Sequence, residues 1–330
     1  MSAMRVKKKA SRAARRHRWA VGLVACMATM LLVAVLFLMY VSPYAIWSRT
    51  YAVLHEAGEQ GYIPVSAQPL DIAVDAPQAF VYDMSAGEIL WQKGEERVVY
   101  PASITKLWSI LTALEYLSPE EIITVGDEVS LIDPASSRAY VSAGQRLTVE
   151  MLIEGMLLPS GNDAVYALAA AAGRVIDPEA ATASDQIAAF VGKMNERAAA
   201  SGLCGSVFLT PDGLAGEEHY TTVEDMILIC RMAMEEPVIA RYASLASDDV
   251  VYESGEVITW VNTNRLLHSD DVYYREGVIG LKTGSLEHNY CVIAAYECEE
   301  KIYLIGIFGA WDKNMRFEDA CVVIDALGDD

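Results

Sequence analysis

The chain has 330 residues, of which 53% are hydrophobic, and its formal net charge is −20 at pH 7. This length is enough for one large domain or two small ones. So acidic a chain excludes nucleic acid as a partner, because such binding depends on basic contacts to phosphate. We interpret the excess acid as an aid to solubility.

The charge is unevenly distributed along the chain. Residues 1–18 hold eight Lys or Arg residues and no acid, which leaves 17 basic against 45 acidic residues in the remainder. Residues 19–41, WAVGLVACMATMLLVAVLFLMYV, contain no charge and exceed the roughly 20 apolar residues that cross a bilayer. We favour an uncleaved anchor over a cleaved signal peptide, whose apolar region is usually about 7–15 residues long.

The N-terminal pattern predicts a single-pass protein of the cell membrane. The positive-inside rule places a basic tail, 1–18, in the cytoplasm and the body outside, joined by a transmembrane signal-anchor, 19–41. Residues 42–75 are interpreted as a juxtamembrane stalk, broken at Gly61 and Pro64. The exported domain is expected to span 76–330.

The sequence of the exported domain predicts strands at both of its ends and helices between them. Its expected strands cover 79–83, 88–92, 277–284, 290–297 and 301–310, and its expected helices cover 102–116, 148–158, 162–173, 184–202, 221–234 and 314–327. Residues 118–150 are rich in turn residues. The order favours an α+β fold, with one antiparallel sheet flanked by helices and an inserted helical subdomain.

A first candidate motif is YPASITKL, residues 100–107. At a helix start, Ser103 and Lys106 lie one turn apart on the same face. The functional interpretation is a nucleophile with its base, aided by the positive potential of the helix N-terminus. The alternative is an ordinary N-cap, and S-x-x-K alone does not decide between them.

Two further motifs follow in the chain. Ser160, Gly161 and Asn162 lie at a break between two predicted helices, and Lys282, Thr283 and Gly284 lie on a predicted strand next to a hairpin. Each has a structural alternative, a helix cap for the first and a polar edge strand for the second.

Together and in this order, the three motifs resemble those of the penicillin-recognising serine acyltransferases. The flanking sequences YPASITKLWSILTALEYL, MLLPSGNDAVYALA, HYTTVEDM, WVNTNRLL and GLKTG are similar to those of the D-alanyl-D-alanine carboxypeptidases, the low-molecular-weight penicillin-binding proteins. The resemblance covers about residues 76–328. It implies the serine β-lactamase/penicillin-binding transpeptidase-like fold, with peptidoglycan stem peptides ending in D-Ala-D-Ala as substrate and β-lactams as inhibitors.

The resemblance also implies a role for each motif residue. Ser103 is the acylated nucleophile, Lys106 its base and Ser160 a proton relay, while Asn162 holds the substrate amide. Lys282 supplies a positive charge that keeps Lys106 neutral. The substrate carboxylate is bound by Thr283 and Arg316, and the backbone N–H groups of Ser103 and Ser285 form the oxyanion hole. Gly284 belongs to the same binding strand.

Other residues are interpreted as structural. His219 and Asp225 match the family flank but have no metal or catalytic partner pattern, and no metal or cofactor is expected. Among Cys204, Cys230, Cys291, Cys298 and Cys321 no CxxC or Cys/His spacing occurs. A pair between Cys291 and Cys298 is the alternative to buried free thiols.

Two competing functions are open to test. A class A β-lactamase uses a Glu four residues before an Asn and a Ser-Asp-Asn motif; this chain has Ser-Gly-Asn and no such Glu. A non-catalytic wall-binding module has no need of Ser103, Lys106 or Lys282. Both are therefore less favoured than a carboxypeptidase.

Overall fold

A five-stranded antiparallel sheet forms the centre of the part of the chain that the computed structural model describes, residues 63–67, 70–95 and 97–328. The strand order is β2-β1-β9-β8-β7. The strands are β1 (Gln78–Asp83), β2 (Glu88–Lys93), β7 (Val278–Leu286), β8 (Asn289–Cys298) and β9 (Lys301–Ala310). Strands from both ends of the body thus share one sheet through the pairing of β1 with β9, as the sequence predicts.

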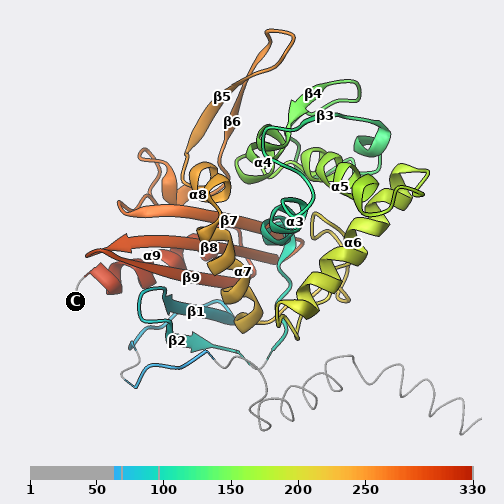
Figure 1. Ribbon diagram of the computed structural model, residues 1–330. Helices are drawn as coiled ribbons and strands as arrows, with labels where there is room; N and C mark the ends of the chain where they lie inside the picture. Colours follow the sequence, from blue (N-terminus) through green and yellow to red (C-terminus); the bar gives the residue numbers. More distant parts are fainter. Residues whose placement is uncertain (1–62, 68–69, 96, 329–330) are drawn as a thin grey trace, which may run out of the picture. The chain divides into compact units, whose positions relative to one another are not determined.

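The two faces of this sheet are covered by different helices (Figure 1). Side chains alternate along each strand, so Val81 and Ile305 face one side while Phe80 and Leu304 face the other. The first face packs against the C-terminal helix α9 (Met315–Gly328), through Phe317 among others. The second face supports the helical region that lies between β2 and β7 in the sequence.

The helical region contains six α-helices among the described residues. They are α3 (Thr105–Ala113), α4 (Val149–Leu157), α5 (Asn162–Ile176), α6 (Ala183–Ala200), α7 (Val223–Glu235) and α8 (Pro237–Ala243). Threonine caps explain several starts: Thr148, Thr182 and Thr222 each accept the backbone N–H three residues later. The α+β architecture with an inserted helical subdomain is confirmed.

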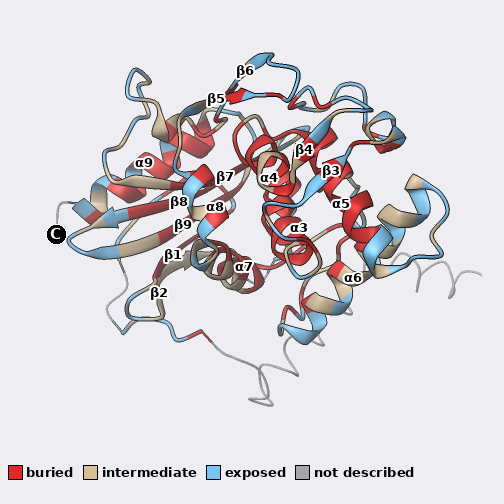
Figure 2. Ribbon diagram, turned by 45° about the horizontal axis from the view of Figure 1, so that its top comes forward, coloured by how far each residue is buried: buried red, intermediate tan, exposed pale blue. Residues whose placement is uncertain are grey.

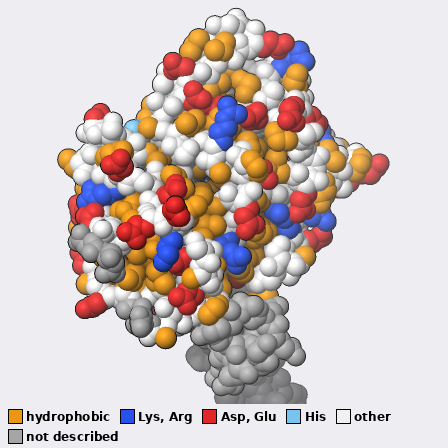
Figure 3. All heavy atoms as spheres, turned by 60° about the vertical axis from the view of Figure 1, so that its left-hand side comes forward, with side chains coloured by type: hydrophobic (Ala, Val, Ile, Leu, Met, Phe, Trp, Pro, Cys, Tyr) orange, Lys and Arg blue, Asp and Glu red, His pale blue; other side chains and the backbone are white. Residues whose placement is uncertain are grey.

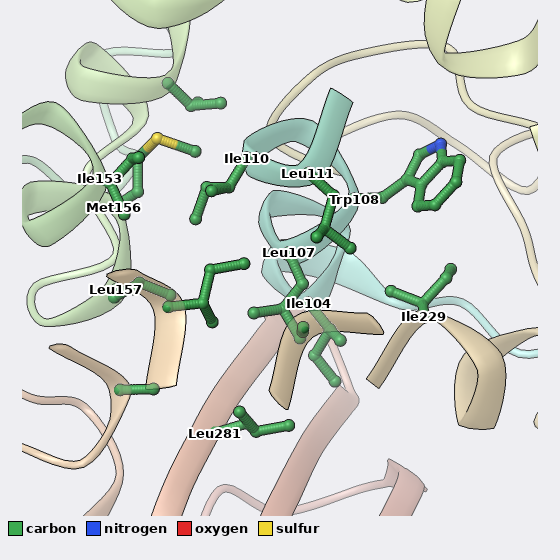
Figure 4. Packing of buried hydrophobic residues seen from close by; sticks show 14 of the residues in the cluster. Ile104, Leu107, Trp108, Ile110, Leu111, Ile153, Met156, Leu157, Ile229 and Leu281 are labelled. Carbon is green, nitrogen blue, oxygen red and sulfur yellow. The ribbon is translucent and has the colours of Figure 1, made fainter. Parts of the chain in front are cut away.

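Helix α3 lies at the middle of the main hydrophobic core. All nine of its residues are buried, and it contacts α5, α6 and α7 (Figure 2). In Figure 4, Ile110 points toward Met156 of α4. A helix buried on every side cannot move without disturbing the core, so whatever it carries is held rigidly.

Three features of the insert were not predicted from the sequence. They are helix α8 and two hairpins, formed by β3 (Ile122–Thr124) with β4 (Arg146–Thr148) and by β5 (Ser247–Val251) with β6 (Val257–Val261). The second hairpin extends away from the body in Figure 1 and exposes alternate residues. Short ribbons with one exposed face carry little hydrophobic pattern, which explains the omission.

The packed body begins before residue 76. Ile63 and Val74, within the expected stalk, are buried, and Val65 pairs with Ile89 of β2. The expected tail, anchor and remaining stalk lie outside the described residues. Within the described ranges, no helix is long and apolar enough to cross a membrane.

Acidic side chains are spread over the face seen in Figure 3 rather than gathered in one patch.

Candidate active site

A pocket of about 350 Å³ lies where the helical region meets the edge strand β7. Six of the residues singled out from the sequence line it: Ser103, Ser160, Asn162, Thr283, Ser285 and Arg316. Lys106 and Lys282 lie fully buried, with 0% exposure. The structure therefore brings together motifs that are up to about 180 residues apart in the sequence.

Ser103 lies in a short 3₁₀ helix, η1 (Ala102–Ile104), that leads directly into α3. Ala102 before it has a left-handed φ of 48°. Strand β7 approaches this turn closely, because a Cβ on Gly284 would lie 2.6 Å from the carbonyl oxygen of Pro101. Gly284 is thus required for the approach of β7 to the serine, rather than for any chemistry of its own.

Lys106 is joined to two other motif residues by hydrogen bonds. Its Nζ donates to Ser103 Oγ at 2.8 Å and to Asn162 Oδ1 at 2.7 Å. Burial lowers the pKa of Lys106 to about 8, although Asp212 and Asp163 act in the opposite direction. A lysine that binds a serine hydroxyl and gives up its proton near neutral pH is equipped to act as a base.

Lys282 is a second buried amine, and its pKa is coupled to the charge of Lys106. Its Nζ donates to the carbonyl oxygen of Thr283 at 3.1 Å. Its pKa is lowered well below the usual value by burial, by Lys106 and by Arg316. The charge of Lys106 thus acts against a second proton on Lys282, and burial is the main cause of the lowered pKa of Lys106.

The Ser160–Asn162 turn is fixed by its neighbours on both sides. Ser160 has a left-handed φ of 62°, and its carbonyl oxygen accepts from Ser137 Oγ at 2.6 Å. Asp163, the next residue, accepts from the backbone N–H groups of Ala139 at 2.8 Å and Val141 at 3.0 Å. These bonds tie the turn to the loop 133–142, which supplies one wall of the pocket.

The opposite wall carries the residues expected to bind a carboxylate. Thr283 Oγ1 lies 2.6 Å from Thr263 Oγ1, so the two hydroxyls share a hydrogen bond. Arg316 Nη1 donates to Ser285 Oγ at 3.0 Å and to the carbonyl oxygen of Gly284 at 2.7 Å. Burial lowers the pKa of Arg316 to about 10, so its guanidinium stays charged at neutral pH.

Sequence reasoning missed several residues of the site. Thr263 belongs to the WVNTNRLL stretch, which was noted only as a flank, and Asp163 directly follows the Ser-Gly-Asn motif. Ser136, Ser137 and Asp133 come from the turn-rich segment and line the pocket. Only the fold shows that these residues belong to the site, because Ser and Asp are common turn residues in any sequence.

The residues interpreted as structural are structural here. Buried His219 contacts Thr105 Oγ1 through Nε2 at 2.9 Å and accepts from Leu209 N at Nδ1, 3.2 Å away, and burial lowers its pKa to about 4. Asp225 accepts from Gly205 N at 2.8 Å and from Ser206 Oγ at 2.6 Å. Cys291 and Cys298 are not bonded to each other, because they stand near opposite ends of β8.

Comparisons with known proteins agree with this geometry. Residues 64–307 match the family model described as D-alanyl-D-alanine carboxypeptidase. The D-alanyl-D-alanine carboxypeptidase DacF of Bacillus subtilis is 29% identical over 77% of this chain and 62% of its own length. The D-alanyl-D-alanine carboxypeptidase of Streptomyces strain K15 is 30% identical over 74% of this chain and 84% of its own length.

Solved structures give the same answer. The crystal structure of the Streptomyces K15 DD-transpeptidase has a TM-score of 0.69 and 27% identity, over 77% of this chain and 97% of its own. The family match covers most of the body, including all three motifs. This chain belongs to the D-alanyl-D-alanine carboxypeptidase family.

Proposed function

We propose that the chain is a serine carboxypeptidase that removes the terminal D-alanine from peptidoglycan stem peptides ending in D-Ala-D-Ala. One observation carries the proposal: Ser103, Lys106 and Asn162 form a hydrogen-bonded series with separations of 2.8 and 2.7 Å, and the serine and asparagine open into the pocket. Family membership supports the substrate class.

The first step is acylation of Ser103. Lys106 takes the proton from Ser103 Oγ, and the oxygen attacks the carbonyl carbon of the penultimate D-alanine. The backbone N–H groups of Ser103 and Ser285 stabilise the oxyanion, a contribution of about 3–4 kcal/mol per donor in related acyl transfers. The C–N bond then breaks, and the proton reaches the leaving amine of D-alanine through Ser160.

The second step is hydrolysis of the ester. Lys106, neutral again, takes a proton from a water molecule that attacks the acyl carbon. Ser103 Oγ leaves and recovers a proton, so the enzyme returns to its starting state with one peptide bond hydrolysed. The substrate's terminal carboxylate is placed by Thr283 and the Arg316 guanidinium, both of which line the pocket.

A β-lactam would acylate Ser103 in the same manner and leave slowly. The test is the intact mass of the full-length chain after incubation with benzylpenicillin, with Ser103→Ala as control. We expect a lasting adduct on the natural chain, none on the variant, and release of D-alanine from a D-Ala-D-Ala peptide by the natural chain alone. Rapid consumption of penicillin without an adduct would favour a β-lactamase, and an unmodified chain beside intact penicillin a binding module.

We also propose that the enzyme acts on the outer side of the cell membrane, held there by residues 19–41. The support is the uncharged length of that segment and the basic residues before it. The chain should sediment with membranes and be extracted only by detergent. Release by alkaline carbonate would contradict the anchor.

A further inference from the structure

A buried carboxylate lies next to the proposed catalytic residues and has no role in the mechanism above. Asp212 is 2% exposed and belongs to the segment Thr210–Leu214, between α6 and α7. Its Oδ2 accepts from Asn162 Nδ2 at 2.8 Å, and its Oδ1 accepts from the backbone N–H of Leu214 at 3.0 Å. Isolated buried carboxylates are costly, so these partners call for an explanation.

The segment that carries Asp212 is pressed against the nucleophile's turn. Gly213 has a φ of 82°, and a Cβ there would lie 1.9 Å from the carbonyl oxygen of Ala102, directly before Ser103. Ser109 Oγ of α3 also donates to the carbonyl oxygen of Pro211 at 2.6 Å. The position of Asp212 is therefore fixed relative to Ser103 and α3.

This contact decides which way the amide of Asn162 points. A carboxylate only accepts hydrogen bonds and a lysine ammonium only donates them. With Nδ2 donating to Asp212, Oδ1 must face Lys106, where it accepts from Nζ at 2.7 Å. An amide turned by 180° would place NH₂ against the lysine and oxygen against the carboxylate, losing both bonds.

Asp212 also acts on Lys106 through its charge. Asp212 and Asp163 both raise the pKa of Lys106 against the effect of burial, and the charge of Lys106 in turn lowers the pKa of Lys282. Asp212 also acts on two other titratable groups. Burial, with a smaller contribution from Asp212, raises the pKa of Tyr166 to about 12, and burial lowers the pKa of His219 to about 4 against the opposing effect of Asp212. Neither of these titrates between pH 5 and 10, so Lys106 is the group that responds.

We propose that Asp212 is a positioning residue for the reaction: it orients the Asn162 amide toward Lys106 and makes Lys106 a stronger base. This proposal rests on the function proposed above. Without the carboxylate, protonated Lys106 loses a stabilising partner, and its pKa falls. A weaker base takes the Ser103 proton less readily, so the rate falls even where Lys106 is neutral.

The test compares Asp212→Asn with Asp225→Asn in the full-length chain. Asn at position 212 removes the charge and can accept from only one of the two donors that Asp212 serves. Asp225 is the matched control, since it is a buried aspartate that anchors another part of the segment between α6 and α7, at Gly205 and Ser206. Both variants should lose some thermal stability, which circular dichroism would measure.

Two readouts separate positioning from stability. One is the titration of the Lys106 ε-carbon by NMR in ¹³C-lysine-labelled protein, assigned by the loss of its signal in Lys106→Arg. The other is the pH profile of kcat/KM for D-alanine release. For Asp212→Asn we expect the Lys106 titration and the acidic limb of the profile to move down by about 0.5–1 pH unit, and the plateau to fall about tenfold or more. Asp225→Asn should move neither.

The outcomes distinguish this proposal from the function on which it rests. An unchanged Lys106 titration in Asp212→Asn overturns the role of Asp212, whatever the activity of the natural chain. The other case is that Asp212→Asn lowers the pH at which Lys106 titrates while the natural chain releases no D-alanine. This result supports the electrostatic coupling and rejects the carboxypeptidase. Equal shifts in both variants also overturn the proposal, because they would reflect general loosening of the segment.

Discussion

The two walls of the pocket are built in different ways. The sheet wall is β7, whose backbone pairs with β8 along almost its whole length. The helical wall is the Ser160–Asn162 turn with the loop 133–142, and it depends on bonds from side chains to distant backbone groups. The backbone hydrogen bonds between β7 and β8 can form with many different side chains, whereas the helical wall depends on a few polar residues. The second wall should therefore be far more sensitive to single substitutions.

The largest effect is expected from Asp163→Ala in the helical wall. It leaves the backbone N–H groups of Ala139 and Val141 buried without their acceptor. We expect the free energy of unfolding to fall by about 3–5 kcal/mol and kcat/KM to fall at least about 100-fold. Urea denaturation and D-alanine release would measure the two effects.

The control for this prediction lies outside both walls. Asp319 of α9 also accepts two backbone N–H groups, those of Asp75 at 3.0 Å and Ala76 at 2.8 Å. Asp319→Ala should destabilise the protein similarly yet leave kcat/KM within about threefold at a temperature where it is folded. Equal losses of activity in the two variants would show that the helical wall has no special sensitivity.

A smaller effect is expected from Thr263→Val, which cuts a link between the walls. Thr263 donates its backbone N–H to Leu158, just before the Ser160 turn, and shares a hydroxyl bond with Thr283 of β7. A hydroxyl has one proton, so while the two hydroxyls are bonded, Thr283 can donate to a substrate carboxylate only with Thr263 as the donor to Thr283. Losing that bond should lower kcat/KM about tenfold, corresponding to about 1.4 kcal/mol.

The substrate's own carboxylate provides the sharper measurement. We expect Thr263→Val to reduce the preference for a D-Ala-D-Ala peptide over its C-terminal amide, and Thr263→Ser to restore it. A Thr263→Val variant that slows both peptides equally would assign Thr263 to structure alone.

The same contrast explains what could be predicted from the sequence. Strands β7, β8 and β9 and helix α3 carry continuous apolar patterns. Two of the three motifs lie on α3 or β7 or at their ends, and the other lies between helices α4 and α5, so fold class and candidate residues followed directly. Asp212 and Asp163 gave no such signal, because an Asp before Gly or at a helix start is typical of turns and caps. Their importance arises from partners about 20–50 residues away, which periodicity does not reveal.

The electrostatics of the lysine pair also lay beyond sequence reasoning. The motifs name Lys106 and Lys282 without showing that both amines are buried and that the pKa of each is lowered. These shifts depend on the burial of each amine and on the charges of Asp212, Asp163 and Arg316. Only the folded arrangement supplies these surroundings.

The pairing of β1 with β9 has a consequence for when the enzyme becomes active. Tyr82 lies beside Leu304, more than 200 residues further along the chain. Contacts of such long sequence separation form slowly and late. The nucleophile's turn rests against β7, which joins β1 only through β8 and β9. We therefore expect Ser103 to be inactive as a nucleophile during synthesis until the ribosome has released residues as far as Ala310 and β9 has completed the sheet.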